Sequence, residues 1–319
     1  MDSGKALSVN GGSRSESAMR LRRLATYASV VVATILIAAK MAAYFLTDSV
    51  AMLSSLLDST IDLLASLVTV YGVASALKPP DRDHRFGHGK AEPLAALAQA
   101  AFITGSSVLL GYESLHRFFH PHALSNENFG YVVMAFAIVL SFALVWFQHH
   151  VISRTGSMAI GADKMHYIGD LAINAGVMVA FALYQLTGLD WFDPLFAVLI
   201  AGGMTFSAFR IAIQALDALM DRELPDADRD RIKKIVRAHA AVRGLHDLRT
   251  RSDGERIFIE FHLELDENTT LKTAHHIADE IMDSIREQFP NSDILVHQDP
   301  AGLTEERLDE QIAKAASGK

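Results

Sequence analysis

The chain has 319 residues, of which 50% are hydrophobic and 21% are charged. This length allows about two domains, and the hydrophobic share is high for a soluble protein with this much charge. The net charge of −8 argues against nucleic acid as a partner. The chain has no cysteine, which excludes disulfides and thiolate metal ligands, so any transition-metal site must use imidazole and carboxylate groups.

The N-terminal segment, residues 1–20, is polar. Arginines are frequent in it and just after it, at Arg14, Arg20, Arg22 and Arg23. The apolar run that follows lacks the small-residue cleavage pattern of a signal peptide. We therefore expect residues 1–20 to form a polar tail that stays in the cytoplasm.

Long apolar blocks occupy the region from residue 21 to residue 221. A helix needs about twenty mostly apolar residues to cross the hydrocarbon core of a bilayer. The blocks of that length lie at residues 24–46, 50–77, 93–115, 129–149, 165–186 and 194–219. The sequence therefore predicts a domain of six transmembrane helices in a lipid bilayer.

Basic residues between the spans predict their orientation, because cytoplasmic loops retain Lys and Arg. The segment after the second span carries Lys78, Arg82, Arg85 and Lys90, and the segment after the fourth carries Arg154 and Lys164. The opposite segments at residues 47–49 and 187–193 carry no basic residue, and the third has Arg117 at its edge. Both termini are therefore expected in the cytoplasm.

Residues 222–300 have the composition of an ordinary soluble, charged domain. The predicted elements are a helix at 227–239, strands at 244–251 and 256–265, a helix at 271–289 and a strand at 293–298. Alternating apolar residues such as Ile257, Ile259 and Phe261 indicate the strands. The αββαβ order suggests a small α+β sandwich with its helices on one face of the sheet. Residues 301–319 are expected to form a loose polar tail.

Charged side chains lie inside two of the predicted spans. Asp58 and Asp62 are four residues apart in the second span, and His166 and Asp170 repeat this spacing in the fifth. Four-residue spacing places each pair on one helix face. An ionised carboxylate near the bilayer centre costs roughly 2.5–3.5 kcal/mol on insertion scales, so such groups normally face a bundle interior or an aqueous cavity and have a function.

Together these four side chains would offer one nitrogen and three carboxylate groups to a small cation. That donor set suits tetrahedral zinc and also accepts cadmium, ferrous iron or, less well, manganese. The alternative is that the groups satisfy one another structurally, as protonated acids bonded across helices. Two pairs on separate spans favour the metal site. Lys40, a lone cation in the first span, is expected to be structural, by snorkelling or pairing.

Two further groups of potential ligands are less specific. The segment from Asp81 to His88 offers acid and imidazole ligands, but on the residues alone a solvated loop is the favoured interpretation. The soluble domain contains several histidines dispersed over strands, and such histidines are usually surface or packed residues. On the outer side, His116, His120 and His122 are expected to be loop-surface residues.

Five motifs follow one another along the chain: Asp58-x-x-x-Asp62, Arg85-Phe86-Gly87-His88-Gly89-Lys90-Ala91-Glu92, His166-x-x-x-Asp170, His246-Asp247-Leu248-Arg249 and His297-Gln298-Asp299-Pro300. With them the sequence resembles the cation diffusion facilitators, and within that family the bacterial branch of ferrous-iron and zinc efflux pumps. The resemblance covers residues 24–300. It implies an all-α six-helix membrane bundle joined to a metallochaperone-like α+β domain.

The resemblance also implies roles for individual residues. It assigns the transport site to Asp58, Asp62, His166 and Asp170. An exposed second site would use Asp81, His84 and His88, with Asp83 as an alternative carboxylate. A two-metal cluster at a dimer interface would use His246, His262, His275, His297 and Asp299, with His276 as an unassigned neighbour. Lys90 and Asp221 would form an interlocking pair at the juncture of the membrane and soluble parts.

The function expected on these grounds is a proton-coupled antiporter in a bacterial inner membrane, acting as a homodimer. It would export zinc first, and also cadmium, ferrous iron or manganese, by alternating access. The same ions would bind the soluble domain as structural or regulatory ions. One alternative is a membrane-bound metal sensor or dimerisation scaffold that does not transport. Another is an intramembrane metalloenzyme, but the chain has no His-Glu-x-x-His signature.

Overall fold

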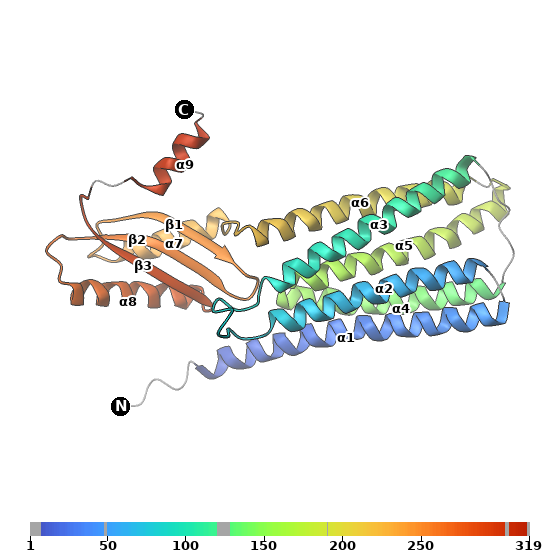
Figure 1. Ribbon diagram of the computed structural model, residues 1–319, viewed down its shortest axis with the longest axis horizontal. Helices are drawn as coiled ribbons and strands as arrows, with labels where there is room; N and C mark the ends of the chain where they lie inside the picture. Colours follow the sequence, from blue (N-terminus) through green and yellow to red (C-terminus); the bar gives the residue numbers. More distant parts are fainter. Residues whose placement is uncertain (1–7, 48–49, 120–127, 190, 304–305, 318–319) are drawn as a thin grey trace. The chain divides into compact units, whose positions relative to one another are not determined.

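The computed structural model describes residues 8–47, 50–119, 128–189, 191–303 and 306–317. The chain forms two compact units, Met1–Leu216 and Asp217–Lys319. The first consists of long helices and the second contains a small sheet (Figure 1).

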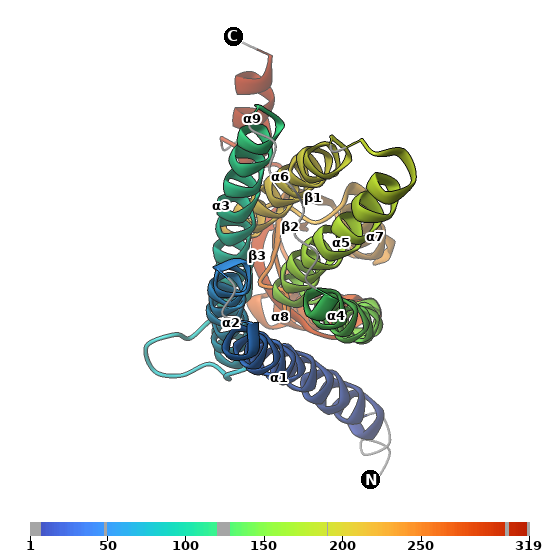
Figure 2. The ribbon, with the colours of Figure 1, turned by 90° about the vertical axis from the view of Figure 1, so that its right-hand side faces the viewer.

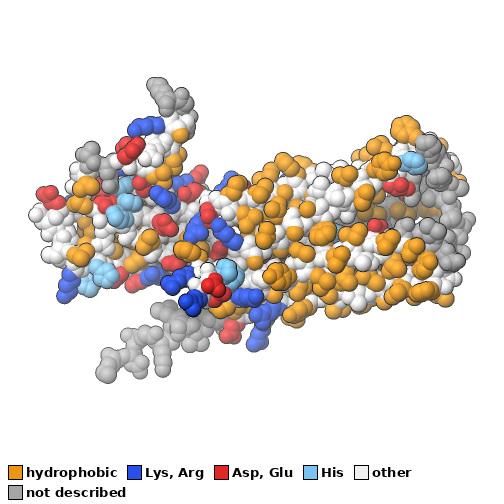
Figure 3. All heavy atoms as spheres, in the orientation of Figure 1, with side chains coloured by type: hydrophobic (Ala, Val, Ile, Leu, Met, Phe, Trp, Pro, Cys, Tyr) orange, Lys and Arg blue, Asp and Glu red, His pale blue; other side chains and the backbone are white. Residues whose placement is uncertain are grey.

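Six long helices build the first unit, and the last of them ends at Leu219, just beyond the boundary of the unit. They are α1 (Ser8–Thr47), α2 (Val50–Ala76), α3 (Ala91–Phe119), α4 (Asn128–Thr155), α5 (Met158–Thr187) and α6 (Phe192–Leu219). Each contains a stretch long and apolar enough to cross a membrane, which confirms the predicted six-helix bundle. Large apolar side chains such as Phe45, Trp146 and Leu186 remain exposed. Hydrophobic side chains cover much of the visible surface of the long helices, as expected for surfaces that face lipid (Figure 3).

The helices pack so that α5 contacts most of the others. α1 packs on α2 and α4, and α5 packs on α4, α3 and α2 (Figure 2). α6 joins through small side chains, since Ala215 packs on Ala96 of α3 and Ala162 of α5. This arrangement places the predicted ligands of α2 and α5 between neighbouring helices.

Two helix starts differ from the sequence prediction. α1 begins at Ser8, so much of the polar segment is helical; residues 8–47 contain no proline that would end the helix. α5 begins at Met158 rather than at residue 165, because Ser157 caps it by accepting a hydrogen bond from the Ile160 N–H. Lys164, expected in a loop, therefore lies on α5.

The second unit contains the predicted αββαβ order. Its elements are α7 (Asp226–Ala238), β1 (Gly244–Ser252), β2 (Ile257–Leu265), α8 (Leu271–Gln288), β3 (Ser292–Pro300) and the additional α9 (Leu308–Ala316). The sheet order is β1-β2-β3, with β1 antiparallel and β3 parallel to β2. Ile259, Phe261 and Leu263 of β2 share one apolar core with Ile232 of α7 and Ile281 of α8, so one face of the sheet is covered by helices.

The prediction of a loose tail is wrong for residues 308–316, which form α9. The first amides of a helix have no partner within it. Here the Asp247 carboxylate accepts hydrogen bonds from the N–H groups of Leu308 and Asp309, both at 2.9 Å. In return the Asp309 carboxylate accepts the Asp247 N–H at 3.0 Å. A residue of β1 thus stabilises a helix that hydrophobic patterning did not indicate.

Candidate metal centres

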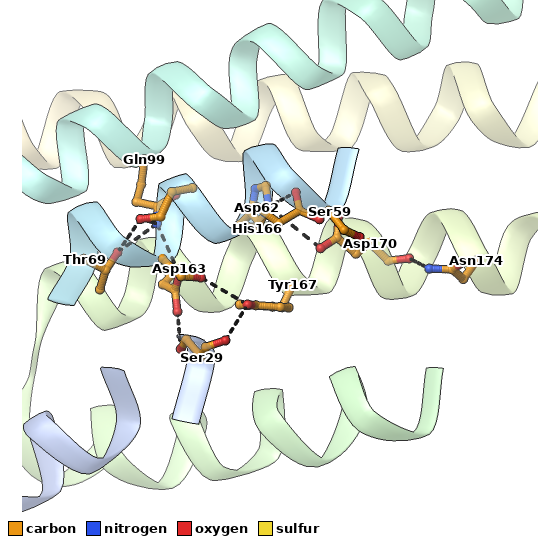
Figure 4. Close-up of polar contacts among 12 residues, drawn as sticks. Ser29, Ser59, Asp62, Thr69, Gln99, Asp163, His166, Tyr167, Asp170 and Asn174 are labelled. Atoms are coloured by element: carbon orange, nitrogen blue, oxygen red, sulfur yellow. Dashed lines mark hydrogen bonds and ion pairs between the residues drawn. The ribbon is translucent and has the colours of Figure 1, made fainter. Parts of the chain in front are cut away.

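The first centre joins a histidine of α5 to carboxylates of α2 and α5. His166 Nε2 lies 2.8 Å from Asp62 Oδ1 and 3.8 Å from Asp170 Oδ2 (Figure 4). His166 is 1% exposed, whereas both carboxylates keep partial access to solvent. We call these three residues the membrane cluster.

Asp58, the fourth predicted ligand, lies next to this cluster without joining it. It lines the same cavity as Asp62 and Asp170. Among the described residues of this region, however, the donor atoms within 4.8 Å of one another are those of Asp62, His166 and Asp170. Asp58 would therefore complete a four-ligand site only after a movement of its side chain.

The spacing of the membrane cluster fits a small divalent cation. With bonds of about 2.0–2.1 Å, the donors of a tetrahedral zinc site lie about 3.4 Å apart. The observed separations of 2.8 and 3.8 Å lie on either side of that value. These two separations therefore need to change by about half an ångström for the residues to hold zinc.

Lys40 lines the cavity and is hydrogen-bonded to the neighbouring helix. Its ammonium group donates hydrogen bonds to Ser59 Oγ at 2.7 Å and to the Ser55 carbonyl at 3.2 Å. Both acceptors belong to α2, so Lys40 ties α1 to the helix that carries Asp62. Its positive charge also lies beside the carboxylates of the cavity.

Asp163 is a buried carboxylate that the sequence analysis missed. It lies on α5 and is 1% exposed. Its carboxylate accepts hydrogen bonds from Ser29 of α1 at 2.6 Å and from Gln99 of α3 at 3.1 Å (Figure 4). It also accepts a hydrogen bond from Gln148 of α4 at 2.7 Å. Asp163 therefore links four helices on the segment of α5 that precedes His166. The sequence signal for it was Ser157, because serine often caps a helix. A fifth helix that starts after Ser157 contains Asp163.

The second centre is the exposed loop before α3. Asp81 lies 3.4 Å from His84 Nδ1 and 3.3 Å from His88 Nε2, so the structure brings all three predicted ligands together. Hydrogen bonds from the backbone N–H of His84 and of Asp83 hold the pKa of Asp81 below its ordinary value. Asp83 contributes its backbone to this turn, whereas its carboxylate is not part of the group. An ionised Asp81 is the form that binds a metal ion.

The third centre lies on the sheet of the second unit. His246 of β1 pairs in register with His262 of β2, which pairs with His297 of β3. The three imidazoles therefore form a row across the sheet. Asp299, two residues beyond His297 and so on the same face, lies among them. Its carboxylate is 2.8 Å from His262, 3.7 Å from His246 and 3.1 Å from His297. We call these four residues the cytoplasmic cluster.

His275, the fifth predicted ligand, is exposed on α8 and contacts Asp279 at 3.4 Å. Among the described residues, it does not belong to the grouped donors of the cytoplasmic cluster. Its contribution from a second chain stays a prediction. In contrast, Glu264 was missed: it lies two residues after His262 on β2, and its carboxylate is 3.0 Å from His246 Nδ1.

The remaining predicted residues fall outside these centres. The pair Lys90 and Asp221 stays a prediction; within its own unit, Asp221 lies 3.5 Å from Arg251. His116 lies at the end of α3, where Tyr112 stacks beside it. His120 and His122 lie outside the described residues.

Two family models match the chain. The model of the cation efflux transmembrane domain matches residues 26–220, and that of the cation efflux protein cytoplasmic domain matches residues 224–301. Together they cover most of both structural units.

Curated relatives are similar over most of their length. The cation-efflux pump FieF of Shewanella oneidensis is 46% identical over 278 residues, which are 87% of this chain and 94% of the relative. The FieF of Cronobacter sakazakii is 42% identical over 284 residues, 89% of this chain and 94% of the relative. A solved structure, the metal-bound C-terminal domain of the CzcD transporter from Thermotoga maritima, is 26% identical over 25% of this chain and 93% of its own, with a TM-score of 0.24.

The two domain matches and the full-length relatives agree with the architecture of six apolar helices followed by a small sheet domain. The protein is accordingly a multi-pass membrane protein and a cation efflux transporter. The chain belongs to the cation diffusion facilitator family.

Proposed function

We propose that this protein exports divalent transition-metal ions from the cytoplasm in exchange for protons, with zinc as its first substrate. Cadmium, ferrous iron and manganese are the further candidates. The observation that carries the proposal is the membrane cluster, in which His166 of α5 lies 2.8 Å from Asp62 of α2 and 3.8 Å from Asp170. Ligands from two helices can change their separation when the helices move.

Competition between metal and protons supports the coupling. Carboxylate and imidazole bind a metal ion only when deprotonated, so protons and metal exclude each other at one set of side chains. An imidazole has a reference pKa of about 6.5 and changes charge within the physiological range. Protons that enter from the outer side would therefore displace the metal and remain until the site opens to the cytoplasm.

Alternating access follows from this competition as the simplest transport cycle. A site open to the cytoplasm would load the ion, and the same site open to the outside would release it against inward proton flow. Asp58 lines the cavity one helical turn from Asp62. It would provide the fourth ligand in one of these states.

The soluble domain would act as a metal-dependent dimerisation module. Its support is the cytoplasmic cluster, whose exposed His297 could share a metal with a second chain. Metal bound there would tighten the dimer and bias the membrane helices, which requires two states with different metal affinity. The pair Lys90 and Asp221 would be the hinge between the two parts, and both termini would lie on the cytoplasmic side of a bacterial inner membrane.

The alternative of a sensor or scaffold without transport predicts metal binding by the soluble domain but no flux. The presence of the membrane cluster favours transport. An intramembrane metalloenzyme would need a general base beside the metal. The family relatives are efflux pumps, which also argues against it.

The test is zinc uptake into proteoliposomes with an imposed pH gradient, repeated with cadmium, ferrous iron and manganese. Wild type would be compared with Asp62→Asn and with the control Asp226→Asn, whose carboxylate is 94% exposed on α7. Uptake that follows the gradient, disappears in Asp62→Asn and persists in the control supports antiport through the membrane cluster. Uptake that does not depend on the pH gradient contradicts proton coupling. If wild type shows no uptake, the alternative of a sensor or scaffold without transport is favoured.

A further inference from the structure

A segment beyond the matched cytoplasmic domain contacts the histidine face of the sheet. The family match ends at residue 301. After it, Arg307 and α9 return to β1 and β2, the strands that carry His246 and His262. We call residues 306–316 the C-terminal clamp.

The first contact of the clamp acts through Glu264. Arg307 donates a hydrogen bond of 2.6 Å to Glu264 Oε1, and the same oxygen lies 3.0 Å from His246 Nδ1. The Glu264 side chain is 15% exposed, so this contact is largely shielded from water. Gly244, its neighbour on β1, makes the position possible: a Cβ there would overlap the Glu264 carboxylate.

Glu264 and Asp299 lie on the sides of different ring nitrogens of His246. Nδ1 faces Glu264, whereas Nε2 faces Asp299 at 3.7 Å and so points into the cytoplasmic cluster. Metal-binding histidines usually donate their second N–H to a carboxylate, which fixes the ring and its tautomer. Glu264 occupies that place, and Arg307 holds Glu264.

The second contact fixes the backbone next to His246. Asp247 has a φ of +52°, which is uncommon outside glycine. It lies where the pairing of β1 and β2 shifts between His246 and Arg249. Its carboxylate accepts two N–H groups of α9, and its own N–H donates to Asp309. These reciprocal bonds hold an otherwise unfavourable conformation beside a metal ligand.

We propose that the C-terminal clamp holds His246 in its metal-binding orientation, through Glu264 and Asp247, and thereby raises the zinc affinity of the cytoplasmic cluster. Arg307 and Glu264 are positioning residues in this scheme. The inference rests on the proposed metal binding by the cytoplasmic cluster. It assigns a role to a segment that lies outside the family match.

The test is a zinc titration of the full-length protein in detergent against a chromophoric chelator. The background carries Asp62→Asn and His84→Ala, which weaken the other two centres. Arg307→Ala, Glu264→Gln and a deletion of residues 303–319 are each expected to lower the zinc affinity of the cytoplasmic cluster at least tenfold, the usual effect of losing such a support. Arg307→Lys should recover part of the affinity. Arg286→Ala, which breaks an exposed ion pair on α8, should leave it unchanged.

A double-mutant cycle separates the clamp from general destabilisation. If Arg307 acts through Glu264, adding Arg307→Ala to Glu264→Gln lowers the affinity little further. Full additivity, or an affinity within twofold of wild type after the deletion, overturns the clamp.

His246→Ala tests whether the cytoplasmic cluster binds zinc at all. Loss of the titratable zinc supports the cluster, whereas an unchanged titration overturns the cluster and the clamp together. Thermal unfolding of metal-free Arg307→Ala and of metal-free Glu264→Gln must match wild type. A matching profile with lost zinc affinity supports positioning, and a lost fold in Arg307→Ala alone overturns it.

Discussion

Asp163 shows how a single carboxylate can hold several membrane helices together. Ser29, Gln99 and Gln148 each donate to it, from three helices other than its own. The arrangement satisfies a polar group that would otherwise be costly to bury. Asp163 is a support for the membrane cluster, because it lies one turn before His166 on α5.

Asp163→Ala is expected to destabilise the membrane unit. The substitution removes the acceptor that three buried side chains share, although each of them keeps another hydrogen-bond partner. A hydrogen bond to a charged group contributes about 1.5–3 kcal/mol. We expect a loss of at least about 2 kcal/mol, measured as a lower midpoint of thermal unfolding in detergent. Ser207→Ala is the control, since the Ser207 hydroxyl is exposed and bonds to the carbonyl of Gly203 on its own helix. Equal midpoints for the two variants would contradict the role of Asp163.

Asp247 predicts a pH dependence of the second unit. Burial alone would raise the pKa of Asp247, but the N–H groups of Asp309 and Leu308 outweigh it and lower the pKa below its ordinary value. The folded state therefore favours the ionised form. Its stabilisation is present above the pKa of the unfolded chain, about 3.9, and is lost as the pH falls through the lower, folded value.

The corresponding measurement compares the unfolding midpoint of wild type and Asp247→Asn between pH 7 and pH 3. The variant should be less stable at pH 7, because the amide is a weaker acceptor for the α9 amides. The difference should shrink as the pH falls below about 4. A difference that stays constant over this range would show that the charge of Asp247 is not what holds α9.

The sequence pointed to the grouped ligand residues more clearly than to the residues that support them. Asp62, His166 and Asp170 stand out because ionisable groups are rare in apolar spans and usually have a function there. Glu264 and Arg307 did not stand out, because charged residues on a soluble domain are usually solvated. Their role depends on a contact between β2 and a segment 43 positions later in the chain, which no local pattern reveals.

At the scale of elements, hydrophobic length and periodicity predicted the six spans and the αββαβ order. These signals are strong because a span or a buried strand needs many residues of one kind. Helix ends are decided by single polar contacts instead. The fifth helix starts earlier than its apolar block because of Ser157, and α9 exists because Asp247 accepts its first amides.

Ser157→Ala is expected to weaken the start of α5. The Ser157 hydroxyl accepts the Ile160 N–H and donates to the buried Glu92 of α3, so the variant loses a cap and a contact between helices. A cap alone contributes about 1 kcal/mol. The unfolding midpoint in detergent should fall, whereas Ser153→Ala, which removes an exposed hydroxyl of α4, should leave it within error. A larger fall of the midpoint in Ser153→Ala than in Ser157→Ala would exclude capping as the reason for the early start of α5.

At the scale of the whole molecule, the two units carry separate candidate metal clusters with different accessibility. The membrane cluster is built around a histidine that is 1% exposed, whereas His297 of the cytoplasmic cluster is 66% exposed in its side chain. A buried site suits an ion that passes through one chain. An exposed ligand on a sheet suits an ion that a second chain can share.

Variants of the two clusters should therefore separate transport from assembly. We expect Asp62→Asn to abolish zinc uptake into proteoliposomes while zinc still increases the dimer fraction in sedimentation. We expect His297→Ala to weaken that zinc-dependent dimerisation, to leave uptake driven by the pH gradient, and to raise the zinc concentration for half-maximal uptake. By linkage, zinc bound at the cytoplasmic cluster of the dimer would favour zinc loading at the membrane cluster. His297→Ala removes this coupling, so half-maximal uptake needs more zinc. Unchanged half-maximal uptake alongside weakened dimerisation would mean that the cytoplasmic cluster assembles the protein without regulating transport.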